Sequence, residues 1–498
     1  MLSGLVFIPI IAAILICFLR QPSGKQVRLI ALAIATIILL LTGAIGTQFN
    51  LLIPGWQFTE YLPWIPQLGL EYKLGIDGLS FPLLALSSLL TWIAIYSTNE
   101  QVQRPQFYYA LIFLVNAGVA GAFVAQNLLL FVLFYELELI PLYLLINIWG
   151  GEKRGYAATK FLIYTAVSGI LIIAGFFGIS WLSDSTSFDY GAINTQGLSL
   201  TTQLILLTIL LLGFGIKIPL VPLHTWLPDA YVEASPPVAI LLGGVLAKLG
   251  TYGLIRFGLG LFPETWALVA PGLAIIGTVS VLYGALTAIA QTDIKRMVAY
   301  SSIGHMGYVL LGGAAANSLS IVGAVSQMVA HGLILALLFH LIGVIETKVG
   351  TRELKLLNGL MNPIRGLPLT TAMLVLAAMA SAGIPGMVGF ISEFIVFQGS
   401  FSVFPILTLL CVVGTGLTAV YFVILLNRTC FGRLDNDHAY YPKVNWQERT
   451  PALILTALIL ILGLQPHWLL RWSEPTTTAM VAAVQLHSNQ QVAQNLDH

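Results

Sequence analysis

Five ionisable residues lie within long apolar stretches of the sequence: Glu136, Glu138, Lys217, Lys248 and Glu393. A charged side chain at the centre of a membrane costs roughly 2.5–3.5 kcal/mol on insertion scales, so such residues face a protein interior, pair with one another and mark ion or proton pathways. Carboxylates and amines can each take up and release a proton. The set therefore predicts a proton path through a membrane, with structural ion pairs between helices as the alternative.

Lys217 stands in "GFGIKIPLVPLHTWLPDA", where Pro219 and Pro222 follow it inside an apolar span. A proline removes a backbone donor and clashes with the preceding helical turn, so we expect the helix to break there. The freed carbonyl groups need protein or water as partners within a membrane. A lysine in such a hydrated break can gain and lose a proton, whereas an arginine would keep it. Lys217 is therefore predicted to carry protons.

Glu136 and Glu138 are two residues apart in "LLLFVLFYELELIPLYLL". This spacing separates them by about 200° around a helix, so both cannot line one narrow path. We expect Glu136, the deeper of the two, to belong to the proton path. Glu138 is expected to contact a neighbouring helix or to lie near a helix end.

The remaining candidates lie further along the chain. Lys248, in "LLGGVLAKLGTYGL", has glycines nearby that permit close helix approach. His331, in "QMVAHGLILALLFH", and His305, in "AYSSIGHMGYV", titrate near neutral pH and are expected to relay protons, although each could instead be a hydrogen-bonded core residue. Glu393 follows Pro385 by about two helical turns in "AGIPGMVGFISEF". The predicted proton path thus contains, in chain order, Glu136, Lys217, Lys248, His331 and Glu393, with His305 as an additional relay.

The composition places these residues in a membrane protein. The chain has 498 residues, of which 57% are hydrophobic and only 9% charged, against about 25% charged residues in soluble domains. A net charge of +1 gives no indication of a nucleic-acid partner. The three cysteines are isolated and no GxGxxG motif follows a predicted strand, so the sequence predicts no metal, cofactor or redox centre in this chain.

Apolar windows of about 20 residues, the length that spans a bilayer, divide the chain into helices. Fourteen such windows are predicted, near 2–19, 27–47, 78–98, 107–125, 127–149, 160–183, 205–229, 236–261, 266–289, 298–315, 318–345, 368–398, 401–428 and 450–472. With the N-terminus outside, almost all basic loop residues lie on the cytoplasmic face, as the bias of Lys and Arg towards that face requires. Only Lys73, Arg256 and Arg471 are assigned to the outer face. Both termini are therefore expected outside.

The seventh and twelfth spans share one feature. Each is long and breaks at an Ile-Pro pair, in "GIKIPLVPL" and in "AGIPGMVGF". Paired interrupted helices in the two halves of a chain are typical of transporters with inverted repeats and a binding site at the membrane midplane. The all-α membrane fold is therefore expected to contain two discontinuous helices.

Taken together, these motifs resemble the antiporter-like membrane subunits of respiratory complex I. The resemblance covers roughly residues 70–435 and includes "YELELIP", "PLHTWLPDA", "QTDIKRMVAYSSIGHMGY" and "QMVAHGL". A glutamate in the twelfth span, at Glu393, resembles the chain-4-type subunit, and "LGIDGLSFPLLALSS" resembles the NAD(P)H-quinone oxidoreductase of cyanobacteria and chloroplasts.

The resemblance implies a domain division as well as a function. It implies N-terminal helices 1–3 in residues 1–106, a first inverted five-helix repeat in 107–261, a second in 266–431, and a last helix with a C-terminal tail in 432–498. Each repeat would form half of a proton channel, with Glu136 and Lys217 as the interacting pair of the first half. Lys248 and His331 would connect the halves, and Glu393 would end the second.

The same resemblance implies the surroundings of the chain. It implies a subunit of a proton-translocating NAD(P)H-quinone oxidoreductase in a cyanobacterial thylakoid or plasma membrane. Other membrane and peripheral subunits would hold the iron–sulfur clusters and the plastoquinone site, with ferredoxin as electron donor in the photosynthetic form. The alternative is a subunit of an Mrp-type monovalent cation/proton antiporter, and a third interpretation is an inactive scaffold.

Two positions depart from the family pattern. Asn127 stands where the family usually has aspartate, and Tyr231 where it has histidine, which puts proton uptake or release near them in doubt. The stretch "DAYVEAS" resembles the variant chain 4 of complexes specialised in CO2 uptake, which implies a CO2-hydrating protein as partner.

Overall fold

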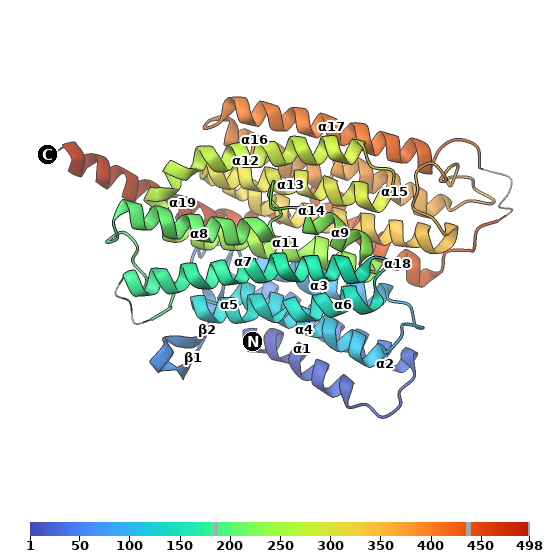
Figure 1. Cartoon of the computed structure of the whole chain (residues 1–498), viewed down its shortest axis with the longest axis horizontal. Helices are drawn as coiled ribbons and strands as arrows, with labels where there is room; N and C mark the ends of the chain where they lie inside the picture. The colour runs from blue at the N-terminus through green and yellow to red at the C-terminus, as the bar shows by residue number, and fades with distance from the viewer. Residues whose placement is uncertain (184, 186, 435–439, 497–498) are drawn as a thin grey trace.

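The computed structural model describes residues 1–183, 185, 187–434 and 440–496, and the side chains up to residue 482. The chain forms a bundle of long, roughly parallel and antiparallel helices (Figure 1). The first part contains α1 (Leu2–Cys17), α2 (Gly24–Gln48), strand β1 (Gln57–Ile65), a short 3-10 turn η1 (Pro66–Leu68), strand β2 (Leu70–Ile76) and α3 (Phe81–Ser97).

The middle of the chain contains shorter and interrupted helices. They are α4 (Pro105–Val124), α5 (Leu128–Leu137), α6 (Leu139–Trp149), α7 (Arg154–Leu182), α8 (Leu200–Lys217), α9 (Trp226–Glu233), α10 (Pro236–Leu241) and α11 (Ala247–Gly253). Two π-helical segments, η2 (Leu242–Leu246) and η3 (Leu254–Leu259), flank α11 and join it to α10 in one 24-residue span.

The last part of the described chain is again helical. It contains α12 (Pro263–Ile289), α13 (Ile294–Ala315), α14 (Ser318–Val349), α15 (Pro368–Ser381), α16 (Val388–Phe401), α17 (Pro405–Thr429), α18 (Trp446–Leu464) and α19 (His467–Leu496). The predicted last span, 450–472, is therefore too long, because α18 ends at Leu464 and a separate helix follows.

The all-α membrane fold is confirmed. Within the described residues, ten helices are long and apolar enough to cross a membrane, and four shorter apolar helices accompany them. The best 18-residue windows of α14 and of the α10–η3 span are fully buried, whereas only 28% of the α2 window and 33% of the α17 window are buried. The first two therefore form the centre of the bundle, and α2 and α17 lie at its outer edges (Figure 1).

Both predicted helix breaks are present. Residues 218–225 separate α8 from α9, and residues 382–387 separate α15 from α16. In the second break, Gly383 and Gly386 have φ angles of +70° and +90°, which side chains with a Cβ rarely adopt. The division of the chain into two inverted repeats at residues 107 and 266 stays a prediction.

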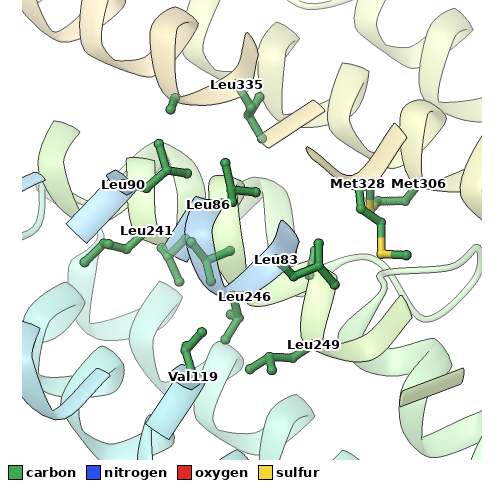
Figure 2. Packing of buried hydrophobic residues seen from close by; sticks show 14 of the residues in the cluster. Leu83, Leu86, Leu90, Val119, Leu241, Leu246, Leu249, Met306, Met328 and Leu335 are labelled. Carbon is green, nitrogen blue, oxygen red and sulfur yellow. The ribbon is translucent and has the colours of Figure 1, made fainter. Parts of the chain in front are cut away.

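The core at the centre of the bundle is made of branched aliphatic side chains. Figure 2 shows Leu83, Leu86 and Leu90 of α3 packed against leucines of the α10–α11 region and against Leu335 of α14. Such close packing excludes water and leaves any polar group in this layer dependent on protein partners.

The antiparallel hairpin of β1 and β2 is not predicted from the sequence, which places residues 48–77 between two predicted spans without assigning them a structure. Its register pairs Gln57 with Ile76 and Ile65 with Leu70. The N-terminal ammonium group of Met1 forms an ion pair with Glu60, so the hairpin is fastened to the start of α1. Hairpin and N-terminus therefore lie at the same end of the bundle (Figure 1).

A prediction concerns the contact between α12 and α13, which pack side by side. A Cβ added at Gly284 of α12 would lie 2.7 Å from the backbone nitrogen of Gly304, and a backbone atom cannot move aside easily. We expect Gly284→Ala to destabilise the chain by about 1–3 kcal/mol through overpacking, measured as a lower thermal unfolding midpoint in detergent.

Gly272→Ala in the same helix is the matched control, because nothing lies within 4 Å of its added Cβ. Its midpoint should stay unchanged or rise slightly, since alanine favours helix. Equal midpoints for the two variants would contradict the contact.

Candidate functional site

Lys217 is the last residue of α8 and lies directly before the first helix break. Only 1% of its surface is exposed. Its Nζ atom lies 2.6 Å from Oε1 of Glu138 and 4.3 Å from the centre of the Tyr135 ring. The lysine cation is thus neutralised by one carboxylate and covered by one aromatic face, two favourable partners for a buried charge.

The acidic partner of Lys217 is therefore Glu138, and the expected pairing with Glu136 is wrong. The expectation treated residues 127–149 as one continuous helix, but α5 ends at Leu137 and α6 begins at Leu139, with Glu138 at the junction. Glu138 is fully buried. Its backbone keeps φ and ψ angles of −77° and −19°, within the helical region, so Glu138 and Glu136 lie on different faces, with Glu138 towards Lys217 and Glu136 towards Gly169 of α7.

Glu136 is half-buried and faces α7. Its carboxylate fills the space beside Gly169 of α7, where a Cβ would collide with it. The contribution of Glu136 to a proton path stays a prediction.

Tyr135 is held in place by two hydrogen bonds in series. Ser168 of α7 donates its hydroxyl hydrogen to the carbonyl of Gly213 at 2.7 Å, so it accepts from the Tyr135 hydroxyl at 3.1 Å. This series joins α5, α7 and α8 immediately beside Lys217. The aromatic partner of the lysine is thus fixed by a network that also holds the helix before the break.

Lys248 and His331 form the second part of the site. Nζ of Lys248 lies 2.9 Å from Nδ1 of His331, and it donates to the carbonyl oxygen of Gly243 at 2.5 Å. Both residues are buried. The carbonyl of Gly243 belongs to the π-helical segment η2, where the regular i→i−4 pattern is disturbed and a carbonyl is available for a side chain. The sequence predicts that glycines near Lys248 permit close helix approach, and Gly243 and Gly244 do face α14 and α3 closely.

His305 and Glu393 complete the series. The His305 and His331 rings are 5.4 Å apart, and Nδ1 of His305 lies 3.3 Å from Oε1 of Glu393. The other ring nitrogen of His305 lies 3.0 Å from the hydroxyl of Ser381, at the second helix break. Thr415 donates to the second oxygen of Glu393 at 3.2 Å. The structure therefore brings the acid and both histidines together between α13, α14 and α16.

The two parts of the site meet where α8 and α11 touch. A Cβ at Gly250 of α11 would lie 3.1 Å from Cβ of Lys217 and 3.0 Å from the backbone nitrogen of Ile218. Gly250 is two residues after Lys248. The first helix break thus packs directly on the helix that carries the next lysine of the series.

The two departures from the family pattern have structural roles. The side chain of Asn127 accepts hydrogen bonds from the backbone of Leu129 and Leu130 and so caps α5. The hydroxyl of Tyr231 donates to the carbonyl of Leu242 at 3.1 Å, next to the carbonyl that Lys248 uses. Both side chains thus satisfy backbone groups near the site.

Sequence reasoning missed Asp77, Tyr135 and Arg256. Arg256 is counted above only among the basic residues of the outer face, but it is buried in η3 and paired with Asp77 at 2.5 Å. A signal existed in the position of Arg256 at the end of a predicted span, within the apolar stretch "LIRFGL". Within the described residues, no group of three or more His, Cys, Asp or Glu side chains is arranged to hold a metal ion.

Comparisons with known proteins show what this chain is similar to. A family model described as NADH:quinone oxidoreductase/Mrp antiporter, TM, matches residues 125–418. A curated relative from Synechococcus elongatus, named NAD(P)H-quinone oxidoreductase chain 4 1, is 41% identical over 492 residues, which cover 97% of this chain and 92% of the relative.

Two solved structures share the fold. A chain of respiratory complex I from Thermus thermophilus with bound NADH matches with a TM-score of 0.88 and 26% identity, covering 97% of this chain and all of that chain. A chain of the Mrp complex from Dietzia sp. matches with a TM-score of 0.85, covering 97% and 98% of the two chains, but its identity of 21% shows the fold alone.

The ion pair at the break gives a testable prediction. Glu138→Gln leaves the buried Lys217 cation without its carboxylate, and breaking a buried pair from one side costs about 3–5 kcal/mol. We expect a clearly lower thermal unfolding midpoint in detergent. Glu136→Gln is the matched control, because it removes the neighbouring carboxylate but leaves the 2.6 Å pair intact. A larger loss of stability for Glu136→Gln would show that the pairing is assigned to the wrong acid.

Proposed function

Because the chain belongs to the membrane-subunit family that NADH:quinone oxidoreductases share with Mrp antiporters, we propose that it translocates protons as the chain-4-type subunit of an NAD(P)H-quinone oxidoreductase. This is the function carried by the relatives that align with nearly its whole length. The chain is then one subunit of a proton-translocating enzyme complex, and other subunits perform the electron transfer.

One observation carries the proposal. Lys248, His331, His305 and Glu393 form a buried series: Lys248 lies 2.9 Å from His331 and His305 lies 3.3 Å from Glu393, while the centres of the two imidazole rings are 5.4 Å apart. Each member can hold and release a proton. The series crosses from the α10–η3 span to the second helix break, so it runs through the centre of the bundle rather than along its surface.

A proton can pass along this series in steps that conserve charge. Protonated Lys248 donates towards Nδ1 of His331 only while that nitrogen carries no proton. If Nδ1 takes up the proton, the imidazole can release one from Nε2, which has no protein hydrogen-bond partner. His305 can accept it, directly or through a water, and Nδ1 of His305 faces the carboxylate of Glu393.

Lys217 and Glu138 supply the control over this series. While the two are paired at 2.6 Å, the lysine charge is neutralised by its partner. If the pair opens, an uncompensated cation remains beside α11 and repels a proton on Lys248, because charges interact strongly in a low-dielectric interior. A change at the first break would therefore push a proton from Lys248 towards His331.

The setting of the complex is part of the same proposal. We assign the iron–sulfur clusters and the plastoquinone site to partner subunits, with ferredoxin as donor, in a cyanobacterial thylakoid or plasma membrane. The stretch around Tyr231 supports the CO2-uptake form with a CO2-hydrating partner, on its resemblance to that variant. A pull-down of the tagged chain in mild detergent, followed by mass spectrometry, would identify these subunits.

Lys217→Ala tests the function. In membrane vesicles that contain the assembled complex, with an electron donor and a quinone acceptor, we expect proton uptake to fall severalfold, because the controlling cation is gone. Proton uptake is measured with a pH-sensitive dye and electron transfer by donor oxidation. Lys355→Ala, at an exposed lysine of the cytoplasmic face, is the control and should pump normally.

Each alternative predicts a different result. Normal pumping by Lys217→Ala would contradict the proposal and favour a scaffold role. Loss of assembly in Lys217→Ala, restored with full pumping when Glu138→Gln is added, would show that the pair only holds helices together. Sodium-dependent transport by the chain with Mrp-type partners would favour the antiporter interpretation.

A further inference from the structure

Arg256 lies on the same span as Lys248 and nearer its outer end. Tyr252 separates the two, four residues from each, and Nε of Arg256 lies 3.4 Å from the Tyr252 hydroxyl. The three side chains therefore follow one another from the centre of the bundle towards the end that carries the hairpin and the N-terminus. Any proton leaving Lys248 outward along this span would meet the guanidinium group.

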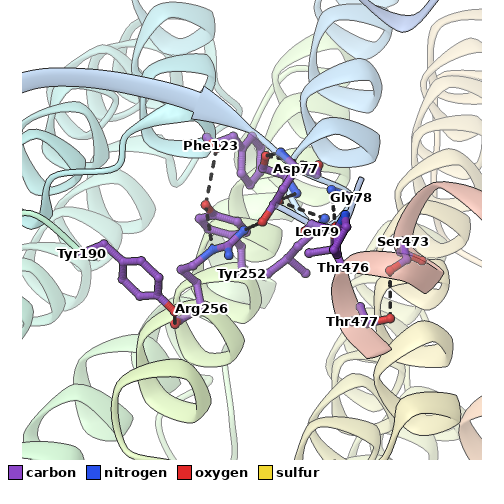
Figure 3. A network of polar contacts seen from close by, with 12 residues as sticks. Asp77, Gly78, Leu79, Phe123, Tyr190, Tyr252, Arg256, Ser473, Thr476 and Thr477 are labelled. Carbon is purple, nitrogen blue, oxygen red and sulfur yellow. Dashed lines mark hydrogen bonds and ion pairs between the residues drawn. The ribbon is translucent and has the colours of Figure 1, made fainter. Parts of the chain in front are cut away.

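The guanidinium group is enclosed on several sides (Figure 3). It pairs with Asp77 at 2.5 Å and lies 4.4 Å, 5.4 Å and 5.8 Å from the ring centres of Trp56, Tyr252 and Tyr190. Only 5% of the Arg256 surface is exposed. The cation is thus surrounded by one carboxylate and three aromatic rings, an arrangement that binds a cation tightly.

Asp77 is fixed independently of the arginine. Its second oxygen accepts hydrogen bonds from the backbone nitrogens of Leu79 and Ser80, just before α3. The adjacent backbone nitrogen of Gly78 donates to Thr476 of α19 at 2.9 Å. The carboxylate therefore cannot follow the arginine if that side chain moves, and the pair has one defined position.

A cavity of about 310 Å³ lies beside the pair. Its lining includes Trp56, Tyr190, Gln196 and Thr476, together with Asp77 and Arg256. These residues come from the two ends of the hairpin, the connection after α7, η3 and α19. Lys73 of the hairpin pairs with Asp189 of the connection at 2.6 Å. The cavity thus opens at the outer end of the bundle and reaches the span that carries Lys248.

We propose that Arg256 and Asp77 form an electrostatic seal that closes the outward end of the Lys248 site, so that a proton on Lys248 passes to His331 instead of leaking into the outer cavity. The proposal rests on the proton-translocating function above. An arginine suits this task because it stays protonated in proteins and cannot relay a proton. A fixed positive charge in a narrow passage also repels hydronium, as in other proton-excluding pores.

A purely structural role explains less of the geometry. Replacing a buried ion pair with apolar residues of similar volume is often neutral or stabilising, so such pairs are poor devices for holding helices together. The seal explains why the pair lies where the outer cavity meets the lysine-bearing span.

The test is the combined variant Asp77→Asn with Arg256→Gln, which removes the charges without leaving one of them buried alone. In vesicles that contain the assembled complex, without electron donor, an imposed pH gradient is followed with an entrapped dye. We expect the gradient to decay at least about threefold faster than in the wild type, because the repulsive charge is gone, while electron transfer to quinone continues.

Glu100→Gln with Arg28→Gln is the matched control, since this pair also joins an arginine, a carboxylate and an aromatic ring but lies on the cytoplasmic face. It should leave the decay unchanged. An assembled Asp77→Asn, Arg256→Gln variant with wild-type decay would overturn the seal. Normal pumping by Lys217→Ala would contradict the proposed function. If Lys217→Ala loses pumping but the Asp77→Asn, Arg256→Gln variant keeps the wild-type decay of the pH gradient, only the seal is contradicted.

A second measurement keeps Arg256 and Asp77 in place, in case the combined variant does not assemble. In a Cys17→Ser background, Gln196→Cys lies on the cavity wall, and Thr251→Cys is buried on the span between Lys248 and Arg256 and leaves the charged pair and its aromatic rings unchanged. With a membrane-impermeant maleimide applied from outside, we expect the cysteine on the wall to react at least about tenfold faster, because the charged pair blocks the way inward. Equal rates would overturn the seal.

Discussion

The structure depends on one constraint: a charge in the water-poor centre of the bundle must have a protein partner, either an opposite charge or a hydrogen-bonding group. Glu138 and Lys217 satisfy it for the first half of the chain at 2.6 Å. Both partners lie beside helix interruptions, Glu138 between α5 and α6 and Lys217 directly before the break between α8 and α9. The pair therefore joins two interrupted helices at the points where they stop.

Much of the fold follows from composition and period. Apolar windows of about 20 residues predict the spans because lipid forces backbone groups to pair internally. The prolines near Lys217 and before Glu393 predict the breaks for the same reason. The sequence does mark the interruption at Glu138, because Pro141 in "YELELIP" cannot donate to the carbonyl of Leu137. The choice between Glu136 and Glu138 could not be predicted, since the sequence does not show which face of this helix meets Lys217. Likewise, Arg256 and Asp77 are 179 residues apart, and only the folded chain shows that they meet.

The π-helical segments explain how the lysine-bearing span holds polar groups inside an otherwise tight core. A π turn shifts the backbone register by one residue and leaves carbonyls free for side chains. In η2, Tyr231 uses the carbonyl of Leu242 and Lys248 uses that of Gly243. In η3, the carbonyl of Arg256 accepts from Tyr190 at 3.3 Å. The carbonyls of the span thus accept hydrogen bonds from its own Lys248 and from tyrosines of neighbouring segments, while its leucines pack against α3 and α14 (Figure 2).

The order of the groups also decides which step of proton transfer needs external energy. A proton that moves from Lys248 to Glu393 neutralises a buried amine and a buried carboxylate at once, and neutral groups are far less costly to bury than charged ones. This transfer is therefore favoured within the chain. The opposite change, recharging Lys248 and releasing the proton from Glu393, separates charge in a low-dielectric interior and needs work from outside. This chain supplies the proton path and the partners of each charge. The energy for recharging Lys248 must therefore reach the path through Lys217 and Glu138 at the first helix break.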